Sequence, residues 1–291
     1  MMRLFFGLLI FSSLTAHAQQ YSMSLGIYTG IAVPFTMDQG INNDPRYRTR
    51  YSVKFAPIGL SYSMDYEHFG ILFTPGIVNI GQSSFAVNNV GGQIGIRHIN
   101  LTYAQLPIGI KYHVIDLSFF RVSAVAAVGA AYLVNGKETI THEAAKIKFP
   151  TTVYPILPSG YTIEYDGVRA PAVKDYPMLQ KQDFNPLQIF VSGGFRSDWD
   201  ISNHWRLSFD FRVNYGIREP RTAAYIDKVK ANQTLYDLPG IRRDLYAQLS
   251  VGMARYLEFE KSDRDRKKRL KGKGQVYSPK KRSHRRPKSR G

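Results

Sequence analysis

The stretch HWRLSFDFRVNYGIR, residues His204 to Arg218, decides the fold class of this chain. From Trp205 to Tyr215 the odd-numbered positions are apolar or aromatic, whereas the even-numbered positions between them are polar or charged. Because successive side chains of a β-strand point to opposite faces, the segment predicts a strand with one apolar face and one charged face. In a soluble sandwich the apolar face would point to the core, whereas in a membrane barrel it would point to lipid.

The aromatic residues at the two ends of this strand favour the membrane barrel. Membrane strands place aromatic side chains at both headgroup levels, and Trp205 and Tyr215 end the apolar face here. The segment between them also has the length, about 9–11 residues, that a tilted strand needs to cross a bilayer. Aromatic residues form 13% of the chain, as expected for a barrel with aromatic girdles.

The N-terminal residues predict export. Arg3 gives a positive start, Leu4 to Leu14 is largely apolar, and Ala16-His17-Ala18 is a small-x-small cleavage site. We therefore predict a signal peptide over residues 1–18, with an N-terminal membrane anchor as the alternative. No later stretch has about 18 consecutive apolar residues, so a membrane role must come from strands. The chain has no cysteine, which excludes disulfides, thiol catalysis and cysteine metal sites.

The whole pattern predicts an all-β fold, an eight-stranded antiparallel transmembrane β-barrel over residues 19–259. The strands are expected at Tyr21–Val33, Tyr51–Tyr66, Phe69–Gln82, His98–Val114, Ser118–Val134, Leu187–Asp200, His204–Ile217 and Arg243–Phe259. The connections between them alternate between tight turns (67–68, 115–117, 201–203) and long loops (34–50, 83–97, 135–186, 218–242). Tight periplasmic turns and longer extracellular loops are typical of outer-membrane barrels, and an even number of strands puts both termini in the periplasm.

Two similar phrases, APIGLSY around Pro57 and LPIGIKY around Pro107, recur fifty residues apart. In each phrase the parity of the apolar positions changes at the proline. Proline cannot donate to a strand ladder, and a β-bulge shifts side-chain parity by one residue, so we predict a bulge at each proline. The alternative is a coincidence between two similar strands.

The phrase YAQLPIGIKY, residues Tyr103 to Tyr112, resembles a strand of the outer-membrane β-barrel domain family typical of Bacteroidota-type bacteria. The matching residues are Tyr103, Leu106, Pro107, Ile108, Ile110, Lys111 and Tyr112. The resemblance covers about Tyr21 to Phe259 and implies the barrel fold, but it implies almost nothing about activity because the family is functionally mixed. Two features depart from the family: the long connection 135–186 and the basic tail that follows Phe259. If the chain ended at its last strand, Phe259 would be the terminal aromatic signal for barrel assembly.

Eight titratable side chains are expected to point into the barrel. They are Asp65, Lys111, His113, Arg121, Arg196, Asp198, Asp210 and Arg212. Such residues could line a polar channel or a proteolytic site, or they could form a buried ion-pair network that fills the barrel. We favour the network, formed by all of them except His113, because eight strands leave an interior just wide enough for side chains and buried charges must be paired.

The sequence contains no catalytic or metal-binding motif. Gly-x-Ser-x-Gly is absent, and no two histidines have His-x-x-x-His spacing. We therefore expect no enzymatic activity and no cofactor. A lipid-modifying enzyme remains an alternative, and it would need a Ser/His pair at the extracellular rim.

The long connection 135–186 is too long for a simple connector. It contains six prolines and four tyrosines, and tyrosine supplies rigid contact area with a polar group. We predict a partly ordered cap or a partner-binding surface, with disorder as the alternative.

Residues 260–291 form a basic tail, with fifteen Lys and Arg against two Asp from Lys261 to Gly291. The tail has too few apolar residues to form a buried core, and we therefore expect it to be disordered. The cations proposed to bind an anion or a partner are Arg266, Lys267, Lys268, Arg269, Lys280, Lys281, Arg282, Arg285 and Arg286. Export excludes nucleic acid and leaves peptidoglycan carboxylates, anionic lipid headgroups and acidic protein surfaces. The alternative is a solvated tail without a specific partner.

These features predict a protein of the cell outer membrane that contacts its lipid. We expect a non-enzymatic scaffold or accessory subunit of an outer-membrane protein complex, of the secretion or barrel-assembly type. Its basic periplasmic tail would tether it to a protein partner or to the cell wall. The alternative is a small porin-like channel for small or hydrophobic solutes.

Overall fold

The computed structural model describes residues 21–257 except 118, 149–156, 158 and 232–236. The expected signal peptide and the basic tail, with all the tail cations named above, lie outside the described residues.

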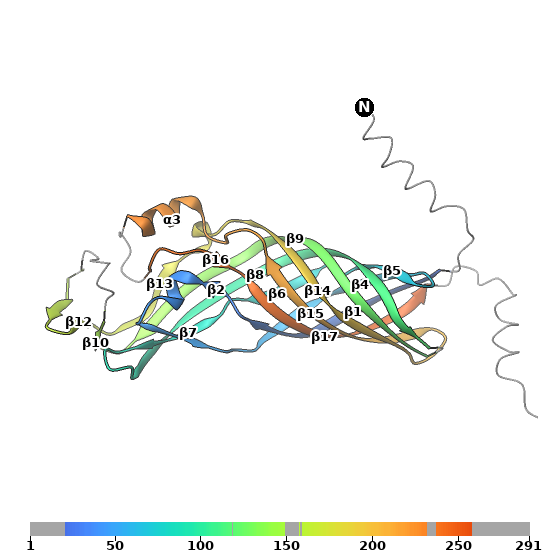
Figure 1. Cartoon of the computed structure of the whole chain (residues 1–291), viewed down its shortest axis with the longest axis horizontal. Coiled ribbons are helices and arrows are strands. Elements are labelled where there is room, and N and C mark those ends of the chain that lie inside the picture. Colours follow the sequence, from blue (N-terminus) through green and yellow to red (C-terminus); the bar gives the residue numbers. More distant parts are fainter. Residues whose placement is uncertain (1–20, 118, 149–156, 158, 232–236, 258–291) are drawn as a thin grey trace, which may run out of the picture. The chain divides into compact units, whose positions relative to one another are not determined.

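The described strands close into an antiparallel β-barrel (Figure 1). The wall strands are β1 (Ser22–Pro34), β4 (Lys54–Asp65), β5 (Phe69–Phe73), β6 (Gly76–Ile80), β8 (Gln93–Asp116), β9 (Phe120–His142), β14 (Leu187–Asp200), β15 (Trp205–Gly216) and β17 (Leu245–Leu257). The pairing runs β9–β14–β15–β17–β1–β4, continues through β5 and β6 to β8, and returns to β9. Counted over the described residues, the ring has eight positions, because β5 and β6 share one. The all-β barrel expected from the sequence is confirmed.

Strand β15 shows the alternation that its sequence predicts. Every even-numbered residue from Arg206 to Gly216 is buried, and every odd-numbered residue from Trp205 to Tyr215 is exposed or half-buried. Pairing with β14 on one side and β17 on the other satisfies its backbone. The apolar face therefore points outward and the charged face points into the barrel.

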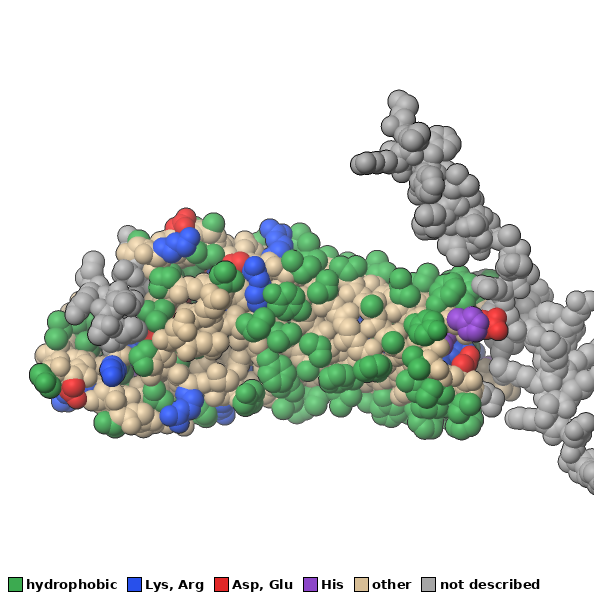
Figure 2. All heavy atoms as spheres, viewed as in Figure 1, with side chains coloured by type: hydrophobic (Ala, Val, Ile, Leu, Met, Phe, Trp, Pro, Cys, Tyr) green, Lys and Arg blue, Asp and Glu red, His purple; other side chains and the backbone are tan. Residues whose placement is uncertain are grey.

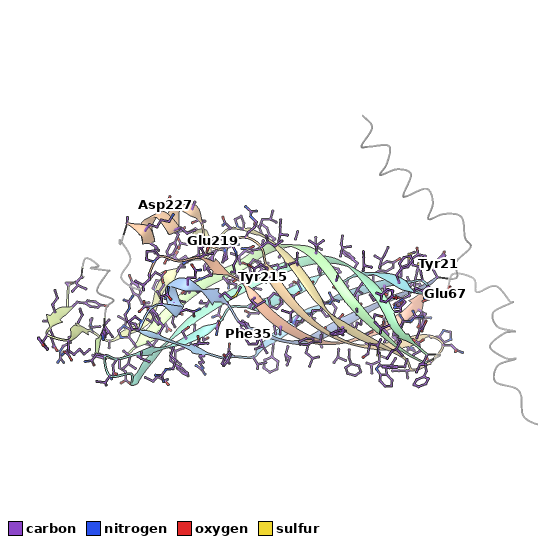
Figure 3. The ribbon with its side chains drawn as sticks, viewed as in Figure 1. Tyr21, Phe35, Glu67, Tyr215, Glu219 and Asp227 are labelled. Carbon is purple, nitrogen blue, oxygen red and sulfur yellow. The ribbon has the colours of Figure 1, made fainter. Side chains whose placement is uncertain are left out.

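The two ends of the barrel differ. Met23 pairs with Leu257, so both described ends of the chain lie at the end with the tight turns, which we call the short-turn end. Figure 3 places Tyr21 and Glu67 at this end, and Glu219 and Asp227 at the opposite, long-loop end. On the face shown in Figure 2, apolar side chains cover the half near the short-turn end, whereas the other half carries a mixed surface. None of the helices in the described ranges is long and apolar enough to span a membrane.

The long-loop end is built largely of β-structure. Its additional elements are β2 (Met37–Asp38), α2 (Gln39–Asn42), β3 (Tyr47–Arg50), β7 (Ser83–Val87), β10 (Ala145–Ile147), β11 (Thr162–Glu164), β12 (Gly167–Ala170), β13 (Val173–Leu179), η2 (Lys181–Asp183), α3 (Ala223–Lys230) and β16 (Arg242–Arg243). Strands β7 and β3 extend the wall beside β8, and β13 pairs with β9.

The assignment of 83–97 and 135–186 as loops was wrong in part. Strands β8 and β9 run well past the predicted ends at His98 and Val134. Their hairpin pairing continues to Gly95 and His142, because two strands of one hairpin satisfy each other's backbone without help from the apolar belt.

Side chains of strand β8 alternate regularly between the inner and outer faces, but the apolar residues move from the inner to the outer face along the strand. Near the long-loop end the apolar residues Leu101 and Tyr103 are buried inside, whereas near the short-turn end Leu106 and Ile108 are exposed outside. The pairing of β8 with β9 is continuous across Pro107, so the predicted bulge at Pro107 was wrong. The change of parity marks the place where the wall leaves the outer apolar belt.

The bulge predicted at Pro57 is confirmed. The register between β1 and β4 shifts between Thr29, which faces Ile58, and Ile31, which faces Phe55. Pro107 instead lies opposite the break between β5 and β6, where its carbonyl accepts a hydrogen bond from the Thr74 backbone.

Candidate functional site

A first cluster of buried charges, which we call the turn-side network, occupies the half of the barrel near the short-turn end. Its members are Asp65, Lys111, Arg196, Asp198, Arg206, Asp210 and Arg212, all at most 5% exposed. Lys111 Nζ lies 2.5 Å from Asp65 Oδ1 and 3.4 Å from Asp198 Oδ2. It also donates a hydrogen bond of 2.6 Å to Ser63 Oγ. One ammonium group therefore links two carboxylates that would otherwise repel each other.

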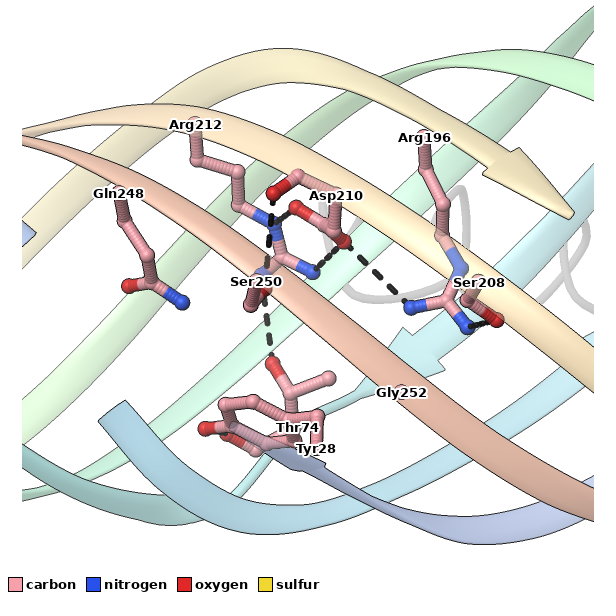
Figure 4. Close-up of a pocket in the computed structure, with 9 residues that line it drawn as sticks. All are labelled: Tyr28, Thr74, Arg196, Ser208, Asp210, Arg212, Gln248, Ser250 and Gly252. Carbon is pink, nitrogen blue, oxygen red and sulfur yellow. Dashed lines mark hydrogen bonds and ion pairs between the residues drawn. The ribbon is translucent and has the colours of Figure 1, made fainter. Parts of the chain in front are cut away.

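Two arginines continue the network along the barrel axis (Figure 4). Arg196 Nε lies 2.8 Å from Asp198 Oδ1, and Arg212 Nη2 lies 2.6 Å from Asp210 Oδ2. The strand register explains the contact between the two pairs, because Arg196 faces Asp210 directly across β14 and β15. Arg196 Nη1 lies 3.4 Å from Asp210 Oδ2, and this contact joins the two ion pairs.

Arg121 and His113 lie at the edge of this network rather than within it. The Arg121 side chain is 19% exposed and pairs with Asp116 at 2.8 Å beside the short turn, although its Nη1 is 3.8 Å from Asp65. His113 Nδ1 makes a hydrogen bond of 2.8 Å with Ser123 Oγ. The structure thus brings six of the seven predicted network residues together in the barrel interior and places Arg121 near the rim.

Arg206 is a network residue that the sequence reasoning missed. Its Nη1 lies 2.5 Å from Asp65 Oδ2, its Nε lies 3.1 Å from Asp200 Oδ1, and its Nη2 donates to the Tyr256 hydroxyl. The signal was available, because Arg206 is an even-numbered residue of the stretch that predicts β15.

Little space remains between these side chains. The cavity beside Arg196, Asp210 and Arg212 has a volume of about 10 Å³, which is room for roughly one water molecule. The packing also leaves no room for a side chain at position 70, because a Cβ on Gly70 would lie 2.4 Å from Asp65 Oδ1.

An apolar layer, which we call the plug, fills the barrel next toward the long-loop end. Phe190 packs edge-to-face against Tyr103 and Tyr246, with ring centroids 5.9 and 5.7 Å apart. Leu101 and Leu133 belong to the same buried cluster. The Tyr246 hydroxyl donates to Gln105 Oε1 at 3.0 Å. The plug is therefore packed like the core of a soluble protein and has its polar groups bonded.

A second cluster of buried charges, which we call the loop-side network, lies at the long-loop end. Its members are Asp38, Arg97, Glu138, Asp237 and Arg242. Arg242 contacts Asp38 at 2.5 Å and Glu138 at 2.8 Å, and Arg97 contacts Asp237 at 2.5 Å and also Glu138. Sequence reasoning missed this network because all five residues lie in segments that were assigned as loops.

The loop-side network also holds helix α3. The Tyr225 hydroxyl, on α3, donates a hydrogen bond to Asp237. Burial raises the pKa of Asp237, but the guanidinium groups of Arg97 and Arg242 more than offset this effect and lower the pKa to about 2. Asp237 is therefore a carboxylate at neutral pH, and it connects the helix to the barrel interior.

Features of an enzyme are few. Ser83 Oγ and His98 Nδ1 lie 3.0 Å apart at the long-loop end, the kind of pair that a lipid-modifying enzyme would need. However, Ser83 is only 3% exposed, and no carboxylate contact to His98 occurs in the described part of the chain. The described residues also contain no group of His, Asp or Glu that could hold a metal ion.

Comparison with known proteins supplies the family. A model described as "Outer membrane protein beta-barrel domain" matches residues 17–219. No curated protein matches the chain. Similar solved structures include OprG from Pseudomonas aeruginosa (8% identity, 83% of this chain and 99% of that chain, TM-score 0.40). The protease OmpT from Escherichia coli (8%, 81% and 97%, 0.37) and Ail of Yersinia pestis (9%, 83% and 100%, 0.31) are also similar.

Proposed function

Since the chain belongs to the outer membrane protein β-barrel domain family, we propose that it is a non-enzymatic scaffold, an accessory subunit of an outer-membrane protein complex. One observation carries this proposal: the barrel interior is filled by two ion-pair networks with a packed plug between them. A barrel filled in this way offers no route for a polar solute. The role of such a barrel is then to present binding surfaces on the two sides of the membrane.

The long-loop end is the first of these surfaces. Strands β8 and β9 rise past the apolar belt as one hairpin, whose register shifts by one residue between Thr102 and Tyr103, and β13 and β7 flank them. Backbone hydrogen bonds along the ladder make this projection rigid, and rigid surfaces lose little entropy on binding a partner. We place this end outside the cell and the short-turn end in the periplasm, following the usual arrangement of such barrels.

The basic tail is the second surface. With both termini in the periplasm, residues 260–291 would start at the short-turn end and reach roughly 100 Å at full extension, using about 3.3 Å per residue. Residues 261–291 carry fifteen positive charges against two negative ones, which favours an acidic protein surface or peptidoglycan. Attraction of this kind is screened over about 8 Å at physiological ionic strength, so it should depend on salt.

Crosslinking in intact cells followed by mass spectrometry tests the scaffold role. We expect the chain stopped after Phe259 to fold and insert but to lose a periplasmic partner that the full-length chain captures. A matched control replaces the nine tail cations named above by glutamine and keeps the tail length; it should also lose the partner. If the stopped chain fails to insert, the tail serves assembly and the tether is wrong. If the partner is retained through high salt, the barrel makes the main contact.

A porin-like channel for hydrophobic solutes is the second candidate, and one observation favours it. Strand β4 pairs with β6 only at Ile58 and Gly59, so Lys54 and Phe55 have a strand partner on the β1 side alone. A side opening there could admit an apolar solute without crossing the plug. Uptake of an apolar dye into vesicles that contain the protein tests this function. Uptake equal to that of empty vesicles contradicts it.

A further inference from the structure

Basic side chains gather on the outer surface of the wall at the long-loop end. Arg50, Ser83 and His98 form one row across β3, β7 and β8, because Arg50 pairs with Ser83 and Ser83 pairs with His98. Adjacent strands lie about 4.8 Å apart, so the row is compact. Ser83 and His98 are also hydrogen-bonded to each other.

Two lysines extend this row toward the apolar belt. Lys137 pairs with Asn100, two residues from His98 along β8. Lys54 Nζ donates a hydrogen bond of 2.7 Å to Asn100 Oδ1. Arg50, His98 and Lys137 therefore share one outward-facing area, and Lys54 reaches its edge through Asn100. We call these four residues the basic patch.

The basic patch begins where the outer apolar surface ends. On β9, Val134 is 47% exposed and Lys137 follows it by three residues, roughly 10 Å along the strand. On β4, Phe55 is 85% exposed on the outer face. In a membrane, this height corresponds to the lipid headgroups rather than to the acyl chains or to bulk water.

Three residues of the basic patch, Arg50, Lys54 and Lys137, have no acidic partner of their own. No ion pair of Arg50, Lys54 or Lys137 with a carboxylate occurs among the residues that the structure describes. Arg50 instead lies over the ring of Phe85, 5.3 Å from its centroid. This differs from the inward-facing arginines, each of which is held by a carboxylate. Because these cations lack counter-charges at the height of the headgroups, we expect them to attract an anionic group of the surrounding leaflet.

We propose that the basic patch binds the phosphate groups of an anionic lipid in the leaflet at the long-loop end. Guanidinium and ammonium groups form charge-assisted hydrogen bonds with phosphate, and the planar guanidinium can donate two at once. The position at the side of the barrel, next to the exposed apolar surface, selects a lipid headgroup over a free anion, because the acyl chains of the same molecule can lie along the wall. This inference is independent of the scaffold role.

Lipid binding to the full-length protein tests the proposal. The protein is placed in nanodiscs of zwitterionic phospholipid and titrated with a diphosphorylated glucosamine lipid or with the same lipid after removal of its phosphates. We expect tighter binding of the phosphorylated lipid. The double variant Arg50→Gln, Lys137→Gln should weaken it by about fivefold for each cation removed near an anionic surface. The charge-preserving variant Arg50→Lys, Lys137→Arg should keep most of the affinity.

Lys228→Gln is the matched control, since Lys228 is an exposed cation on α3 outside the basic patch; it should bind as the wild type does. Heat-modifiable mobility in gels verifies that every variant is folded. Equal affinity for the two lipids would overturn the proposal, and so would an unchanged affinity in the double variant. Displacement of the lipid by millimolar inorganic phosphate would show a site for free anions and would also overturn it.

Discussion

Lys111 is the residue on which the turn-side network depends most. Its ammonium group is fully buried between Asp65 and Asp198. Lys111→Met keeps most of the side-chain volume but removes the charge, which leaves the two carboxylates less compensated. Removing one partner of a buried ion pair costs about 3–5 kcal/mol, so we expect a loss of that size in the free energy of unfolding. Urea unfolding in lipid vesicles, followed by tryptophan fluorescence, measures it.

Lys181→Met is the control for this variant, because Lys181 is exposed at the long-loop end and its loss should change the unfolding free energy by well under 1 kcal/mol. A Lys111→Met protein as stable as the wild type would contradict the network.

Asp237 makes the attachment of α3 dependent on pH. Its pKa in the folded protein, about 2, lies below the value of about 3.9 for an unperturbed aspartate. The lowered pKa therefore contributes stability that is present above about pH 4 and is lost as the pH falls toward about 2. With about 1.4 kcal/mol for each pKa unit, the contribution is on the order of 2–3 kcal/mol.

Hydrogen–deuterium exchange of residues 223–230 between about pH 5 and about pH 2 measures this effect. After correction for the intrinsic exchange rate, we expect protection to fall in this range. Asp237→Asn should be less protected at about pH 5 and should show a weaker pH dependence. The matched variant Asp227→Asn changes an exposed acid of the same helix and should behave as the wild type does. Protection that stays constant down to about pH 2 contradicts the role of Asp237.

Sequence reasoning reached the buried charges of the short-turn half because they lie on strands with clear alternation. Asp210 and Arg212 follow directly from the parity of their strand. Glu138 and Arg97 did not follow, because their strands continue beyond the apolar belt and a barrel pattern was not expected there. Asp237 lies between elements, so its contact with Arg97 depends on a long-range approach of the chain that no local pattern encodes.

Among the elements, β15 gives the clearest test of which face meets lipid. Phe209 is on its outward face and 41% exposed. Phe209→Arg would place a charge in the hydrocarbon, so we expect a cost of about 2–4 kcal/mol if the site is near the midplane. Ala223→Arg, on the exposed start of α3, is the control with little expected effect. Equal stability of the two variants in vesicles would refute the membrane-barrel topology.

Strands β8 and β9 explain why the element boundaries were only partly predictable. Inside the apolar belt, an outward apolar face and an inward polar face give a clear pattern. Beyond it the preference reverses, as Leu101 and Leu106 on opposite faces of β8 illustrate. If apolar residues are assumed to face outward along the whole strand, this reversal is mistaken for a bulge or for the end of the strand. The bulge at Pro57 is real and the one at Pro107 is not, although the two phrases look alike.

At the scale of the whole molecule, the barrel combines two kinds of packing. Its short-turn half is a membrane barrel with charges inside, and its long-loop half has an apolar core that continues into the plug. This division follows from the solvent outside: lipid favours apolar side chains on the outer surface, whereas water leaves them to the interior. The central claim is that the combined interior is closed to solutes.

Recordings from planar bilayers that contain the full-length protein test this claim most directly. Fluorescently labelled protein verifies incorporation, and a porin added afterwards verifies that the membrane can report a channel. We expect no steady conductance above that of the bare bilayer, because the two networks and the plug leave a cavity of only about 10 Å³ beside the turn-side charges. Current steps of uniform size from the incorporated protein would contradict the closed interior and favour the porin-like channel.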